Sequence, residues 1–116
     1  MDSIPESTSS GRLMIIATAK IAPGQESRYE ELAKQVKAHI DAGKEPGTNF
    51  GFQLTYRVTR KLDAASKPTG EYIIIEEYTG VDYKSALVKH TQNPVTQEIL
   101  TSGIVADASI EVVDEF

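Results

Sequence analysis

The order of the sequence patterns predicts an α+β fold of the ferredoxin-like, split βαββαβ type. Four segments carry the branched or alternating apolar residues of β-strands, and two carry apolar residues at the three- and four-residue steps of amphipathic helices. Their order is strand, helix, strand, strand, helix, strand. This order is typical of a four-stranded antiparallel sheet with two main helices on one face.

The chain of 116 residues has the length of one domain with a single core. Its first residues, MDSIPESTSSG, are polar and rich in serine, so we predict a flexible N-terminal tail over residues 1–12. Residues 13–116 are then expected to form one folded domain.

Residues 13–21 (LMIIATAKI) are rich in branched apolar side chains and predict the first strand, which ends at the Pro23-Gly24 turn. Residues 26–43 predict the first helix, with Gly43 as its stop signal. Its apolar stripe is made of Tyr29, Leu32, Ala33, Val36 and Ile40.

The second and third strands are expected at residues 50–58 (FGFQLTYRV) and 71–78 (EYIIIEEY). Residues 59–70 (TRKLDAASKPTG) between them are polar and contain turn residues at their end, so they predict a hairpin with a long loop.

Asp82 can cap a second helix over residues 82–92 (DYKSALVKHTQ). Asn93-Pro94 interrupts that helix before a further helical piece near residues 95–100. The last strand is expected at residues 104–113 (IVADASIEVV), which alternate again.

The apolar runs at residues 13–16 and 73–75 occupy consecutive positions, which a strand must divide between both faces of the sheet. Two helices cover only one face. We therefore expect a second copy of the chain to cover the open face and form a homodimer. The alternative is that short isoleucine runs simply occur in strands.

The composition excludes several classes of protein. A net charge of −5 and scattered basic residues argue against nucleic-acid binding, which needs a clustered basic surface. Without cysteine there is no disulfide framework or zinc-thiolate site, which is compatible with a cytoplasmic location. No apolar run approaches the roughly 20 residues that span a membrane, so we expect no membrane partner.

A candidate site follows from the faces of these elements. Tyr83, Leu87 and His90 share one stripe of the second helix, so His90 is expected to point toward the sheet. The strand positions that share a face are Tyr72, Ile74, Glu76 and Tyr78 on the third strand, and Phe50, Phe52, Leu54 and Tyr56 on the second. A pocket with aromatic walls around one imidazole would suit a flat, mostly apolar organic ligand.

The chain also resembles a known family in four stretches: residues 14–47 (MIIATAKIAPGQESRYEELAKQVKAHIDAGKEPG), 50–57 (FGFQLTYR), 74–78 (IIEEY) and 85–100 (SALVKHTQNPVTQEIL). Together they look like the antibiotic biosynthesis monooxygenase (ABM) domain of the dimeric α+β barrel superfamily. The resemblance extends over nearly everything from Leu13 to the C-terminus. It implies the ferredoxin-like fold and a homodimer.

The same resemblance implies what the site residues do. Family members include oxygenases of aromatic polyketides that use neither metal nor flavin, haem-degrading oxygenases and sugar-phosphate isomerases. His90 matches the family's helix histidine, Glu76 its strand carboxylate, and Tyr78 a position where many members have an aromatic residue. The chain has no Trp and no His after His90, which argues against haem degradation.

We therefore expect a cofactor-independent monooxygenase of an aromatic or polyketide-like molecule, with no metal and no cofactor. His90 would be the base or orienting group, and Tyr78 its polar partner. The other expected substrate-binding residues are Phe50, Phe52, Tyr56, Ile74, Glu76, Tyr83 and Leu87. One departure is that the segment from Tyr78 to His90 is about one helical turn longer than is usual in the family.

Two alternatives stay open. The pocket could instead serve a redox-neutral enzyme, such as an isomerase, decarboxylase or cyclase, or a non-catalytic dimeric module that binds a metabolite. An inward histidine is also often a hydrogen-bonded structural residue, and tyrosines at such positions are often core residues.

Overall fold

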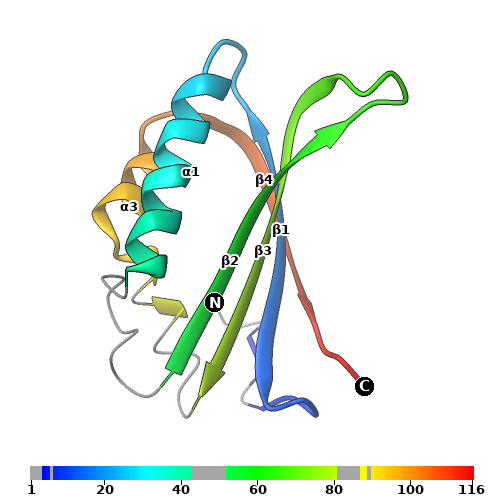
Figure 1. Cartoon of the computed structure of the whole chain (residues 1–116), viewed down its shortest axis with the longest axis vertical. Coiled ribbons are helices and arrows are strands. Elements are labelled where there is room, and N and C mark those ends of the chain that lie inside the picture. The colour runs from blue at the N-terminus through cyan, green and yellow to red at the C-terminus, as the bar shows by residue number, and fades with distance from the viewer. Residues whose placement is uncertain (1–3, 6, 43–51, 81–86, 89) are drawn as a thin grey trace.

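A computed structural model describes residues 4, 5, 7–42, 52–80, 87, 88 and 90–116, and the side chains of these except 52–54, 79 and 80. Its elements are β1 (Arg12–Ile21), α1 (Glu26–Asp41), β2 (Phe52–Leu62), β3 (Pro68–Gly80), α3 (Pro94–Thr101) and β4 (Val105–Val113), as Figure 1 shows.

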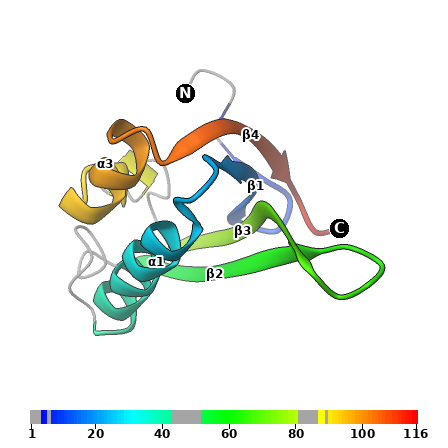
Figure 2. The same ribbon diagram turned by 90° about the horizontal axis from the view of Figure 1, so that it is seen from above.

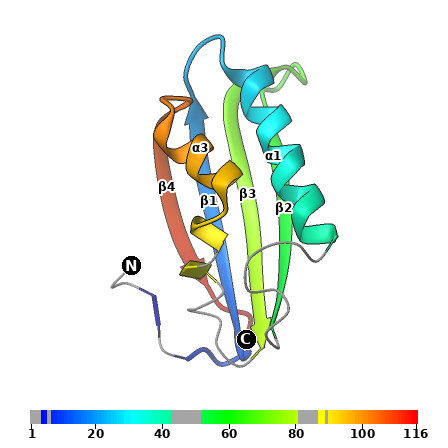
Figure 3. The same ribbon diagram turned by 90° about the vertical axis from the view of Figure 1, so that its left-hand side faces the viewer.

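The strands form one antiparallel sheet in the order β2-β3-β1-β4. Both α1 and α3 lie on the same face of this sheet (Figures 1 and 2). In Figure 3, α1 lies in front of β2 and β3, and α3 lies beside it in front of β1 and β4. The structure therefore confirms the predicted ferredoxin-like α+β fold. No helix in the described ranges is long and apolar enough to cross a membrane.

The two central strands divide their side chains between the core and the open face. Leu13 and Ile15 of β1 are buried beneath the helices, whereas Met14 and Ile16 on the opposite face are only partly buried. β3 behaves in the same way, and its Ile73 and Ile75 lie on the face that has no helix. The consecutive apolar runs are thus split between the two faces, as a period of two requires.

The hairpin between β2 and β3 differs from the expectation of a long loop over residues 59–70. The strands continue to Leu62 and resume at Pro68, so only residues 63–67 form the turn. The Asp63 carboxylate closes this turn by accepting hydrogen bonds from the backbone N–H groups of Ala65 (2.8 Å) and Lys67 (3.0 Å). The polar residues of this segment were predicted to form a loop. They belong to strands that extend into water, and strands that are exposed on both faces need no alternation of apolar residues.

The helical segment near the C-terminal half begins again at Asn93. The Asn93 side chain accepts a hydrogen bond from the Val95 backbone N–H at 2.9 Å and caps α3, and Pro94 occupies the first turn. Residues 87, 88, 90 and 91, which precede this cap, are helical. The expected helix start at Asp82 lies outside the described residues.

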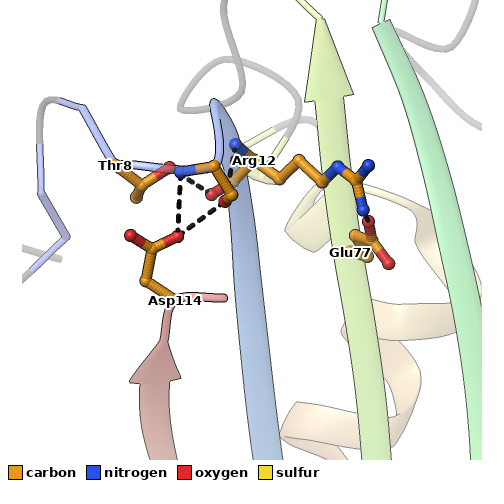
Figure 4. A network of polar contacts seen from close by, with 5 residues as sticks. Thr8, Arg12, Glu77 and Asp114 are labelled. Atoms are coloured by element: carbon orange, nitrogen blue, oxygen red, sulfur yellow. Dashed lines mark hydrogen bonds and ion pairs between the residues drawn. The ribbon is translucent and has the colours of Figure 1, made fainter. Parts of the chain in front are cut away.

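The N-terminal segment contacts the end of β4 (Figure 4). The Asp114 carboxylate accepts hydrogen bonds from the Ser9 backbone (2.8 Å) and from the Ser10 hydroxyl (2.6 Å). Next to it, Arg12 pairs with Glu77 of β3 at 3.0 Å, and Ile4 is buried. Residues expected to form a tail therefore make contacts that their composition does not indicate, while their flexibility stays a prediction.

Candidate functional site

A buried carboxylate and a buried imidazole meet between the sheet and the helical segment. His90 Nε2 lies 2.8 Å from Glu76 Oε1, and the two residues are only 5% and 8% exposed. The distance is that of a strong hydrogen bond with a charged acceptor. When the imidazole is neutral, the proton on Nε2 is donated to Glu76, and Nδ1 is the basic nitrogen.

Two tyrosines surround this pair. The Tyr78 hydroxyl donates to Glu76 Oε1 at 3.3 Å, and its ring lies edge-on to His90 with centroids 6.3 Å apart. The Tyr56 ring is closer to the imidazole, at 5.4 Å and a tilt of 55°. Tyr56, Tyr78 and His90 are all buried, so the pair lies in an aromatic environment.

The strand register explains why these side chains meet. Glu76 and Tyr78 are two residues apart on β3 and point to the same face, and Tyr56 of β2 is the cross-strand partner of Glu76. Leu87, three residues before His90, is buried on the same side of its helical turn. His90 thus reaches Glu76 even though the preceding segment is longer than the family resemblance implies.

The environment of the pair suggests a role beyond stability. A carboxylate that leaves water loses its hydration, and burial of an ion pair is often no more stabilising than an apolar replacement. A buried acid–base pair among tyrosines is therefore a candidate for proton transfer.

The structure brings together six of the nine expected site residues on the helix-covered side of the sheet, namely His90, Tyr78, Tyr56, Ile74, Glu76 and Leu87. Phe50 and Tyr83 lie outside the described residues, and Phe52 is described only as a position in the backbone of β2. In the parts of the chain that the structure describes, no three His, Cys, Asp or Glu side chains gather as metal ligands would.

The sequence analysis missed a second polar cluster, made of Glu30 on α1, Arg60 on β2 and Tyr72 on β3. Arg60 donates to Glu30 through Nε (3.0 Å) and Nη2 (2.5 Å), and the Tyr72 hydroxyl donates to Glu30 Oε2 at 2.5 Å. Hydrogen bonds from Arg60 and Tyr72 lower the pKa of Glu30. Burial and the bond to Glu30 raise the pKa of Tyr72 to about 12.

The second cluster and the Glu76–His90 pair have Tyr29 between them. The Tyr29 ring lies 4.7 Å from the Tyr72 ring. Burial raises the pKa of Tyr29, and the nearby Tyr72 and Glu76 raise it further. The apolar stripe of α1 predicted that Tyr29 is buried. It could not predict which residues Tyr29 contacts, because Tyr72 lies on a strand that is distant in the sequence.

A groove opens beside the second cluster, between α1 and the edge strand β2. Its volume is about 580 Å³. Its walls are formed by Glu30, Ala33, Lys34, Lys37, Arg57, Val58, Thr59, Arg60, Leu62 and Tyr72. None of the expected site residues lines this groove, so it is separate from the Glu76–His90 pair.

Comparison with known proteins by sequence finds no matching family and no matching curated protein. Comparison of structures does find similar folds. A structure from Caulobacter crescentus named "putative antibiotic biosynthesis monooxygenase" has a TM-score of 0.65 and 22% identity, over 91% of this chain and 91% of that chain. One of the same name from Nitrosomonas europaea has a TM-score of 0.64 and 13% identity, over 91% of each chain.

A protein from Pseudomonas aeruginosa is equally similar in structure, with a TM-score of 0.65 and 18% identity over 91% of this chain and 95% of that chain. At these identities the similarity concerns the fold, and function has to be argued from the site. The chain therefore has the ferredoxin-like α+β fold of structures that carry the name antibiotic biosynthesis monooxygenase.

Proposed function

We propose that the protein is a cofactor-independent monooxygenase of an aromatic, polyketide-like small molecule that binds beside His90. The observation that carries the proposal is the buried Glu76–His90 pair with Tyr56 and Tyr78 around it. The names of the structural neighbours support the same type of reaction.

The protein's part in such a reaction is to remove a proton from the substrate. Glu76 accepts the Nε2 proton of His90, orients the ring and stabilises the imidazolium that forms when Nδ1 takes a proton. Tyr56 and Tyr78 supply ring surfaces against which an aromatic substrate can pack. Exclusion of water by these buried side chains strengthens each charge interaction.

The oxidation itself needs only oxygen and an electron-rich substrate. With an anthrone, loss of a ring C–H proton to His90 gives a carbanion that donates one electron to O₂. The resulting radical and superoxide combine to a peroxide anion. This anion takes the proton back from the His90 imidazolium to give a hydroperoxide, which loses water. The CH₂ group becomes a carbonyl, one oxygen atom enters the product and the other leaves as water, so no external reductant is needed.

The same pair favours a second candidate, a redox-neutral isomerase, decarboxylase or cyclase. A carboxylate–histidine pair transfers protons and contributes nothing specific to oxygen chemistry. The two candidates share the base and differ in the fate of the substrate anion.

We also propose that the protein acts as a homodimer. Met14, Ile16, Ile73 and Ile75 lie on the sheet face opposite α1 and α3 and are partly exposed in the single chain. A second sheet packed on this face would bury them, in the way that two sheets pack in a sandwich.

The test is oxygen uptake by the purified protein, without added metal or flavin, over a panel of anthrones, hydroquinones and catechols. We expect uptake above the uncatalysed rate, and a loss of about 10²–10⁴-fold in kcat for His90→Gln. Glu76→Gln should lose a similar factor, because a neutral amide no longer stabilises the imidazolium. His39→Gln, which changes the other histidine of the chain, is the matched control and should keep full activity.

Exchange of substrate C–H protons with D₂O is followed by NMR in the same samples. Exchange that depends on His90 without oxygen uptake would replace the oxygenase proposal with the redox-neutral one. A His90→Gln protein that folds and retains full turnover would remove His90 from the mechanism.

A further inference from the structure

We propose that the groove between α1 and β2 is a second binding site, which takes an amphipathic organic anion: an aliphatic or aromatic body with a carboxylate. The site goes beyond the proposed function, because its walls include neither His90 nor Glu76.

The groove is built from two regular elements. Glu30, Ala33, Lys34 and Lys37 occupy the three- and four-residue steps that align on one face of α1. The opposite wall is β2, the edge strand of the sheet, from Arg57 to Leu62. A volume of about 580 Å³ falls within the roughly 300–1,000 Å³ of small-molecule sites.

The charges at the groove are opposite to those of the whole chain. The protein has a net charge of −5, yet four cations line the groove with one carboxylate, Glu30. Arg60 and Tyr72 already bond to Glu30, and Lys37 pairs with Asp41 at 3.0 Å. Within the described residues, Lys34 and Arg57 have no ion pair. Lys34, on the face of α1 that lines the groove, can therefore bind an anionic head group. The Arg57 side chain leaves β2 on the opposite face of the sheet, because Arg57 is the cross-strand partner of Ile75.

The rest of the lining is apolar. Ala33 and Val58 line the groove together with the cations, and the buried Tyr72 borders it. Leu62 is 53% exposed, which makes it one of the few large apolar side chains that face solvent in the described ranges. A hydrocarbon body placed along Val58 and Leu62 would cover this surface while its carboxylate lies near Lys34.

The Arg60–Glu30 ion pair favours a compact ligand over an extended peptide. It joins β2 to α1, so a peptide strand added along the free edge of β2 on this side would have to displace it. A small molecule can occupy the groove without breaking the pair.

The test is a titration of the full chain with decanoate and with 2-naphthoate, followed by ¹H–¹³C methyl NMR. The neutral analogues are decan-1-ol and 2-naphthamide. We expect saturable shifts of the Ala33, Val58 and Leu62 methyl groups with one or both acids, and binding at least about tenfold weaker for the neutral analogues, since each charge contact adds affinity. The two acids separate an aliphatic from an aromatic ligand.

K34Q should weaken binding of the acid by about fivefold. K67Q removes the same charge outside the groove and should change binding less than about twofold. Equal binding of acid and neutral analogue, shifts confined to methyl groups outside the groove, or equal affinity of K34Q and K67Q would overturn the proposal. Tight binding of an acidic peptide in place of either acid would also overturn it.

Discussion

The Glu76 carboxylate is buried, lies 2.8 Å from His90 Nε2 and accepts a hydrogen bond from the Tyr78 hydroxyl. Removal of one donor leaves a charged group in the interior with fewer partners, which costs more than the hydrogen bond contributed. The contribution of each member of the pair to the free energy of unfolding should therefore depend on the presence of the other member.

A double-mutant cycle measures this dependence. His90→Ala is expected to lower the free energy of unfolding by about 3 kcal/mol, because the Glu76 carboxylate stays buried without the imidazole. After Glu76→Gln the same change should cost at least about 1 kcal/mol less. Urea unfolding of the four proteins gives the coupling. Costs that add within about 0.5 kcal/mol would show that the pair is not coupled.

Glu30 links α1 to β2 and should make stability depend on pH. Its pKa is lowered from an ordinary value of 4.5, chiefly by the hydrogen bond from Arg60. A lowered pKa in the folded state stabilises the protein above pH 4.5, and this contribution is lost as the pH falls through the lower folded value.

Arg60→Gln should therefore lower Tm at pH 7, and its effect should shrink as the pH falls through the lowered pKa of Glu30, because the protonated carboxyl no longer pairs with Arg60. The measurement is thermal unfolding of both proteins between pH 3 and pH 8. Lys61→Gln on the same strand is the control, because Lys61 does not contact Glu30. A Tm difference that stays constant over this range would contradict the expected role of Glu30.

At the scale of elements, the start of α3 depends on Asn93. This side chain is 1% exposed, and its oxygen caps the helix through the Val95 N–H. The hydrogen bond satisfies one of the donors that a helix start leaves without a partner.

Asn93→Ala should lower the free energy of unfolding by about 1–2 kcal/mol, because the cap is lost. Asn93→Asp keeps an acceptor at the same place and should recover most of this stability. Chemical denaturation followed by circular dichroism gives both values. Equal stability of the Ala and Asp variants would mean that the cap contributes little.

The hairpin and the edge strand show where element prediction fails. Residues 59–62 (TRKL) lack an apolar alternation and still belong to β2, paired with β3 as far as Leu62 and Pro68. Backbone pairing with β3, rather than burial of side chains, extends β2 over these residues. The apolar periodicity of the sequence therefore does not predict this part of the strand.

At the scale of the whole molecule, the open face of the sheet is the surface through which we propose that the chain dimerises. Ile16, Ile73 and Ile75 lie there at the centre of the two middle strands, whereas α1 and α3 cover the opposite face. Burial of this surface is the driving force that we expect for the homodimer.

Ile75→Lys should convert the dimer to a monomer. Each dimer would carry two buried lysines at a cost of about 2 kcal/mol each, so the dissociation constant should rise by about 10³-fold. Sedimentation equilibrium measures the mass over a range of concentrations. Ile110→Lys is the control, since Ile110 is already 63% exposed and lies on the other face. A monomeric unmodified protein would exclude the homodimer.

Local patterns predicted much of the fold. The first strand was expected from residue 13 and begins at Arg12, and α1 begins at Glu26 as expected. The alternation along residues 72–78 also placed Glu76 and Tyr78 on one face. These features depend on neighbours in sequence, whose spacing determines which side chains share a face.

The pairing of His90 with Glu76, the Glu30–Arg60–Tyr72 cluster and the groove beside this cluster were decided only by the tertiary structure. Glu76 and His90 are 14 residues apart in the sequence, and Glu30 and Tyr72 are 42 residues apart. The sequence by itself determined the elements and the apolar face of each, because both follow from short-range periodicity. Contacts between elements depend on the order of the strands and on how the helices pack against the sheet. The spacing of apolar residues within a single element does not determine either.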